Sequence, residues 1–85
     1  MKSFQYTIKD ELGIHARPAG ALVKLAKASG SSMTMTKGEK TVDVSRLMAL
    51  MGLGVKCGDE ITVTAEGGDE DAAIAEVKKF VEENL

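Results

Sequence analysis

The apolar side chains of this chain of 85 residues recur with two different periods, and the order of these periods constrains its fold more than any other feature. Four short segments are apolar at every second residue, which is typical of strands with one buried face: Ser3–Lys9, Met33–Thr36, Thr41–Val44 and Glu60–Glu66. Three further segments have the spacing or the composition of helices: Ala16–Ala28, Arg46–Met51 and Glu70–Glu83. The pattern therefore predicts the order strand, helix, strand, strand, helix, strand, helix.

This order predicts one α+β domain that spans residues 1–85. A chain of this length has room for a single hydrophobic core, because domains typically hold about 100–150 residues. Helices with one apolar stripe and strands with one apolar face bury them against each other, so we expect the helices to cover one side of a sheet. The other side of the sheet is expected to face water.

Composition and charge exclude several classes of function. Eleven basic and thirteen acidic side chains give a net charge of −2, which lacks the basic surplus that nucleic-acid binding requires. No stretch approaches the roughly 18 apolar residues of a membrane span, and the N-terminal segment lacks the apolar core of a signal peptide. The single cysteine, Cys57, cannot form an internal disulfide. We therefore expect a cytoplasmic protein that binds neither nucleic acid nor membrane.

The only histidine, His15, stands directly before the helix that is predicted to begin at Ala16. The start of a helix has unpaired amides and about half a positive charge, so it attracts anions. The amides of Ala16 and Arg17 would face such an anion, and the guanidinium of Arg17 would clamp it. Pro18 is tolerated in this first turn because its missing amide would have no helical partner. These residues predict a phosphate site in which a ring nitrogen of His15 attacks a phosphoryl donor.

A histidine that merely caps the helix is the alternative interpretation. The context favours the phosphate site, because Gly13 permits a tight turn before His15 and no other acid–base pair competes in the chain. A metal site is not expected, since one histidine and one cysteine cannot complete a tetrahedral shell. No cofactor is expected either: the segment 52–54 lacks the third glycine of a dinucleotide fingerprint and follows a helix, so we interpret it as a helix end.

The short helix predicted at 46–51 is unusually apolar. Large apolar side chains occupy most of the segment, more than one face of a short helix needs for burial: Leu47, Met48, Leu50, Met51 and Leu53. We expect Leu50 and Leu53 to pack inward and Met48 to stay exposed with part of Leu47 and Met51, as an adaptable patch for protein partners. The alternative is that all five belong to the core.

Three segments together resemble one known family. They are Gly13-Ile14-His15-Ala16-Arg17-Pro18-Ala19, Met48-Ala49-Leu50-Met51-Gly52-Leu53-Gly54-Val55 and Gly58-Asp59-Glu60-Ile61-Thr62-Val63. They resemble HPr, the histidine-containing phosphocarrier of the phosphoenolpyruvate-dependent sugar phosphotransferase system, over essentially the whole chain. The resemblance implies an open-faced β-sandwich of order βαββαβα, with a four-stranded antiparallel sheet covered on one side by three helices.

The resemblance also implies the chemistry and the partners. His15 would accept a phosphoryl group at Nδ1 from phosphorylated enzyme I and pass it to enzyme IIA domains, while Arg17 contacts the phosphoryl group. Leu47, Met48 and Met51 would belong to the docking face. Such a carrier is consumed and regenerated stoichiometrically, so it is not an enzyme, and a monomer suits that role.

One position departs from the family pattern. Arg46 stands where HPr of some bacteria has a regulatory serine, and Ser45 lies one residue earlier. Ser45 is expected to cap the following helix, and its use as a substitute phosphorylation site for HPr kinase/phosphorylase is the alternative. Two other functions stay open at this point: a paralogue that serves a nitrogen-related phosphotransferase chain, and a regulatory binding module that is never phosphorylated.

Overall fold

A computed structural model describes residues 1–85, and its elements follow the predicted order. The strands are β1 (Lys2–Thr7), β2 (Ser32–Lys37), β3 (Lys40–Asp43) and β4 (Glu60–Glu66). The helices are α1 (Ala16–Ala28), α2 (Leu47–Gly52) and α3 (Glu70–Asn84). None of the helices is long and apolar enough to cross a membrane.

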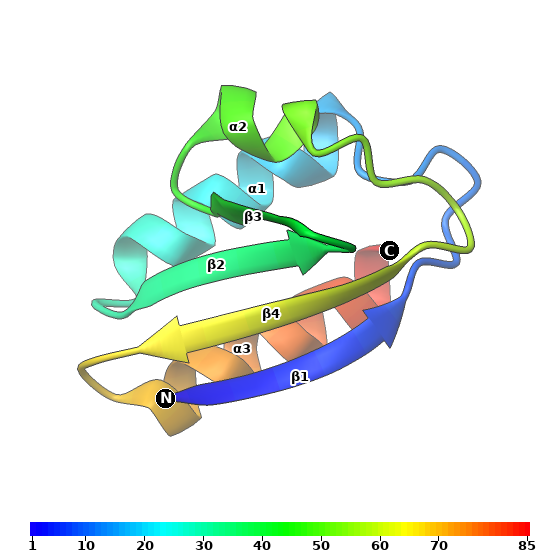
Figure 1. Cartoon of the computed structure of the whole chain (residues 1–85). Helices are drawn as coiled ribbons and strands as arrows, with labels where there is room; N and C mark the ends of the chain where they lie inside the picture. The colour runs from blue at the N-terminus through cyan, green and yellow to red at the C-terminus, as the bar shows by residue number, and fades with distance from the viewer.

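The four strands form one antiparallel sheet in the order β1-β4-β2-β3. In Figure 1 the strands lie in front, with α1 and α3 behind the sheet and α2 above β3. The register places threonines opposite each other on the side of the sheet away from the helices: Thr34 pairs with Thr64, and Thr36 with Thr62. The open-faced α+β sandwich that the sequence predicts is therefore confirmed.

The hydrophobic core lies between the sheet and the helices. The central strands contribute alternate residues that are fully buried, such as Met35 and Val63, which face each other across β2 and β4. Each long helix adds a stripe at helical spacing: Ala19, Leu22 and Ala26 from α1, and Ala73, Val77 and Val81 from α3. The apolar stripe of α1, which begins at Ala19, holds the first turn of that helix against the sheet.

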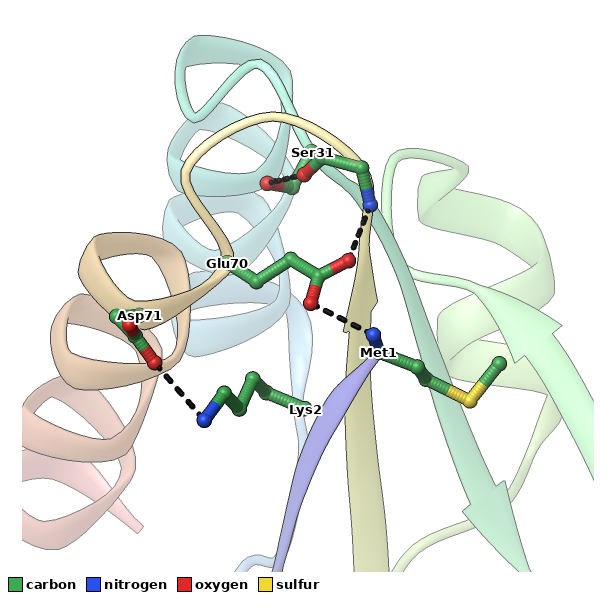
Figure 2. Close-up of polar contacts among 6 residues, drawn as sticks. Met1, Lys2, Ser31, Glu70 and Asp71 are labelled. Atoms are coloured by element: carbon green, nitrogen blue, oxygen red, sulfur yellow. Dashed lines mark hydrogen bonds and ion pairs between the residues drawn. The ribbon is translucent and has the colours of Figure 1, made fainter.

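The start of β1 is tied to the start of α3 (Figure 2). The carboxylate of Glu70 accepts from the amino group of Met1 at 2.6 Å and from the amide of Gly67 at 2.7 Å. Asp69 caps α3 as predicted, because its carboxylate accepts from the amide of Ala72 at 3.1 Å. These contacts join the edge strand to the turn between β4 and α3.

Several bounds differ from the prediction by one residue. The largest difference is in the first strand, which ends at Thr7 rather than Lys9, because its pairing with β4 ends at Glu60 and the amide of Lys9 donates to the carbonyl of Leu85 instead. The predicted cap at Ser45 is wrong: α2 begins at Leu47, and Arg46 holds the N-cap position. The amide and the hydroxyl of Ser45 both donate to the carboxylate of Asp43, at 2.9 and 2.7 Å, which holds Ser45 in the preceding turn, one residue before the cap position.

Candidate functional site

His15 lies at the N-cap position of α1, where the sequence predicts it. Its backbone is extended, with φ −104° and ψ −177°, and its carbonyl accepts the first helical hydrogen bond from the amide of Ala19 at 3.0 Å. The imidazole makes no capping hydrogen bond and is half-buried. The ring nitrogens are therefore not engaged in holding the helix, and both are available for chemistry.

The first turn of α1 leaves donors without partners beside this ring. The amides of Ala16 and Arg17 donate to no acceptor in the chain, because the carbonyls that would lie four residues earlier are outside the helix. The guanidinium of Arg17 is exposed and forms no ion pair. No acidic residue lies in this first turn, so nothing in α1 offsets the partial positive charge of the helix start.

Backbone packing before the helix fixes the position of His15. Gly13 has a φ of +66°, and a Cβ at this residue would lie 2.3 Å from the carbonyl oxygen of Val55 and 2.7 Å from Cα of Lys56. The amide of Ile14 donates to the same Val55 oxygen at 3.2 Å. The loop after α2 is thus in direct contact with the turn that carries His15, and only glycine fits at residue 13.

That loop is itself fixed by a charged pair. The ammonium of Lys37 lies 3.0 Å from a carboxylate oxygen of Asp59 and donates to the carbonyl of Gly54 at 2.8 Å. The same Asp59 oxygen accepts from the amide of Lys56 at 2.8 Å. The hydrogen bond from the Lys56 amide, and to a smaller extent the one from the Lys37 ammonium, lowers the pKa of Asp59. The end of β2 therefore braces the segment on which Gly13 packs.

A pocket of about 300 Å³ opens beside the histidine. It is lined by residues of the β1–α1 loop, the first turns of α1 and the end of α3: Asp10, His15, Arg17, Pro18, Ala21, Phe80 and Asn84. Sequence reasoning identified His15 and Arg17 and missed the other polar members, Asp10 and Asn84. The nearness of Asp10 along the chain was a usable signal for the first, whereas nothing in the sequence places Asn84 here.

The apolar surface of α2 is divided as predicted. Leu50 and Leu53 are buried, while 41% of Leu47, 82% of Met48 and 38% of Met51 are exposed. Helix α2 packs on α1, and in Figure 1 its last turn lies at the end of the molecule where α1 begins. The alternative that all five side chains belong to the core is therefore wrong.

Ser45 lies away from the pocket, between β3 and α2. Its amide and its hydroxyl both donate to one carboxylate oxygen of Asp43, at 2.9 and 2.7 Å. The hydroxyl and then the amide lower the pKa of Asp43, and the charge of Arg46 adds a smaller effect. Cys57 is exposed in the loop before β4, and no group of three or more side chains is placed to hold a metal ion.

Known proteins resemble this chain over nearly its whole length. Residues 2–83 match the family model PTS-HPr, described as the PTS HPr component phosphorylation site. The chain belongs to the HPr family. The phosphocarrier protein HPr of Mycoplasma capricolum is 39% identical over 93% of this chain and 89% of its own length, and HPr of Lysinibacillus sphaericus is 42% identical over 86% and 83%.

Solved HPr structures share the fold closely. The histidine-containing phosphocarrier protein of a Mycoplasma superimposes with a TM-score of 0.93 at 36% identity, covering 96% of this chain and 93% of that one. Crh of Bacillus subtilis, described as a dimer with a swapped domain, has a TM-score of 0.78 at 32% identity and covers 94% and 92%. Like HPr, this chain is a phosphocarrier of the phosphotransferase system and not an enzyme.

Proposed function

We propose that His15 accepts a phosphoryl group at Nδ1 from phosphorylated enzyme I and passes it to an enzyme IIA domain during sugar uptake. One observation carries the proposal: an imidazole without a hydrogen-bond partner stands at a helix start, beside two unpaired amides and an unpaired arginine.

The chemistry follows from these groups. The lone pair of Nδ1 attacks phosphorus, the P–N bond forms, and the bond between phosphorus and the donor's side chain breaks with its electrons staying on the donor. The amides of Ala16 and Arg17 face the phosphoryl oxygens, and the guanidinium of Arg17 offers a forked pair of donors to them. Transfer to the acceptor reverses these steps and returns His15 to its free form.

The exposed patch of Leu47, Met48 and Met51 would be the surface on which enzyme I and enzyme IIA dock. A shuttle needs a small contact that separates quickly, below about 1,200 Å² in total. Methionine suits a surface that meets two partners in turn, because its unbranched side chain adapts to differing contacts. A monomer in the cytoplasm fits this role, since each partner requires access to the same face.

The test is phosphorylation of the purified protein by phosphoenolpyruvate and enzyme I. We expect one acid-labile, alkali-stable phosphate, located at Nδ1 of His15 by intact mass and phosphorus NMR and absent from the His15→Ala variant. An enzyme I that phosphorylates a control HPr but leaves this protein unmodified would overturn the proposal. Repeating the assay with enzyme I and enzyme IIA of a sugar phosphotransferase system, and then with those of a nitrogen-related phosphotransferase system, tells which of the two systems the carrier serves.

Docking is tested by Met48→Asp, which places a charge in the centre of the patch. We expect the concentration of carrier that half-saturates enzyme I to rise at least about tenfold, as for a central contact residue, with a smaller change in the maximal rate. Ala72→Asp is the matched control, because Ala72 is exposed in the first turn of α3, where an acidic residue suits the helix dipole. Equal behaviour of the two variants would remove α2 from the interface.

Regulation at Ser45 is a separate prediction, and the contacts of this residue disfavour it. A phosphoryl group on the hydroxyl would lie against the carboxylate of Asp43, which now accepts from that hydroxyl. Incubation with ATP and HPr kinase/phosphorylase decides the matter: labelling that is lost in Ser45→Ala would establish the site, and no labelling would remove it.

A further inference from the structure

The pocket beside His15 contains one group that is unexpected in a phosphoryl site. Asp10 lines the same cavity as His15 and Arg17, and it is the only acidic side chain there. A carboxylate repels a phosphoryl group, so this residue opposes the amides and the guanidinium that stabilise the group. The pocket thus brings one fixed anion and one cation to the same phosphoryl site.

The carboxylate of Asp10 is held in place. Its Oδ1 accepts from the amide of Leu12 at 2.9 Å, and its own carbonyl accepts from the amide of Gly13 at 3.0 Å. The amide of Asp10 donates to the carbonyl of Leu85 at 2.6 Å, which ties the turn to the end of α3. Asp10 forms no ion pair, so no cation is in direct contact with its carboxylate.

We propose that Asp10 raises the phosphoryl-transfer potential of the carrier by repelling the phosphoryl group on His15. The proposal rests on His15 as the acceptor. The carboxylate makes the phosphorylated form less stable, and this repulsion is relieved when the P–N bond breaks and the phosphoryl group leaves with the acceptor. The repulsion therefore favours departure of the phosphoryl group, which is what a carrier requires of a group that it must pass on.

The size of the effect follows from the pocket. A sphere of the pocket's volume is about 8 Å across, and a phosphoryl group carries nearly two negative charges at neutral pH. Across that distance, in a medium close to water, Coulomb repulsion by one carboxylate shifts the equilibrium between the phosphorylated and the free carrier by about fivefold toward the free form. Salt weakens such an interaction, because the screening length falls from about 30 Å at 0.01 M to about 3 Å at 1 M.

The test uses the isosteric variant Asp10→Asn. Its amide oxygen still accepts from the amide of Leu12, so the turn is preserved while the charge is removed. Glu11→Gln is the matched control: it removes the same charge from the next residue, whose side chain is exposed and does not line the pocket. Potassium phosphoramidate loads His15 chemically, so the comparison does not depend on any protein partner.

The readout is hydrolysis of the loaded proteins at 0.01 M salt, followed by phosphorus NMR. Water attacks phosphorus, the P–N bond breaks, inorganic phosphate leaves, and the ring nitrogen takes up a proton. We expect the phosphorylated form of Asp10→Asn to have a half-life about fivefold longer than that of the phosphorylated wild type. The half-life of phosphorylated Glu11→Gln should differ from that of the wild type by less than about twofold. The difference between Asp10→Asn and the wild type should shrink at 1 M salt. A half-life of Asp10→Asn that equals the control's, or is shorter, would overturn the inference, whereas failure of enzyme I to load the wild type would overturn only the proposed function.

Discussion

Substituting Gly13 by alanine combines two costs, the strain of a left-handed backbone and a steric clash, and a second variant separates them. The left-handed φ of +66° costs an alanine about 1–2 kcal/mol. The added Cβ would also lie 2.3 Å from the Val55 oxygen, about 1 Å closer than an ordinary contact, and neither group is a flexible side chain. Displacing packed backbone costs a further 1–3 kcal/mol or so.

Gly30→Ala is the control for strain alone. Gly30 has a φ of +76°, and a Cβ there meets no atom within 4 Å. We therefore expect Gly13→Ala to be less stable than Gly30→Ala by about 1–3 kcal/mol in urea unfolding, which in a domain of this size is a difference in Tm of about 4–8 °C for each kcal/mol.

The two variants should differ in function as well. The contact between Gly13 and Val55 fixes the turn two residues before His15, so its displacement moves the imidazole relative to the amides of α1. We expect folded Gly13→Ala to be phosphorylated by enzyme I more slowly than folded Gly30→Ala. If the two variants lose the same stability and accept phosphate at the same rate, the packing argument for Gly13 is refuted.

Two further outcomes test the core and the charged contacts. Leu50→Ala should lower the free energy of unfolding by about 2–5 kcal/mol, because Leu50 is fully buried. Met48→Ala, on the exposed side of the same helix, should change the free energy of unfolding by less than about 0.5 kcal/mol. Thermal unfolding measures both changes. The hydrogen bond from the amino group of Met1, and to a smaller extent the one from the amide of Gly67, lowers the pKa of Glu70 below its ordinary value of 4.5. The carboxylate therefore contributes its full stabilisation above pH 4.5, and this contribution is lost as the pH falls through the lowered pKa. Glu70→Gln should therefore be less stable than the wild type at neutral pH and converge with it in acid, and a stability gap that stays constant with pH would contradict this.

The sequence predicts most of the fold because its signals are local. The alternation in β4 and the helical stripe of α1 each lie within one segment, and the predicted bounds of these two elements agree with the structure. The cap at Asp69 is equally local, since its acceptor and donor lie three residues apart. The absence of a cap at Ser45 was not predictable in the same way, because Asp43 accepts from both its amide and its hydroxyl and so holds Ser45 in the turn one residue before the helix cap.

The candidate site is predicted only where it is local. His15 and Arg17 belong to one turn, so their spacing alone places them together. Phe80 and Asn84 reach the pocket because α3 packs beside α1, and residues separated by some 65 positions give no pattern that reveals this contact. Exposure of Met48 was predictable, since a short helix cannot bury large side chains on all of its faces.

The short length of α2 has a consequence for how the family can vary in length. Only three residues, 45–47, separate the buried Val44 from the exposed Met48, and the buried Leu50 follows two residues later. Successive helical residues are rotated by about 100°, so a residue inserted or deleted in this stretch would turn the exposed side inward and bring Leu50 to the surface. Insertions and deletions should therefore be absent between β3 and α2 in working carriers.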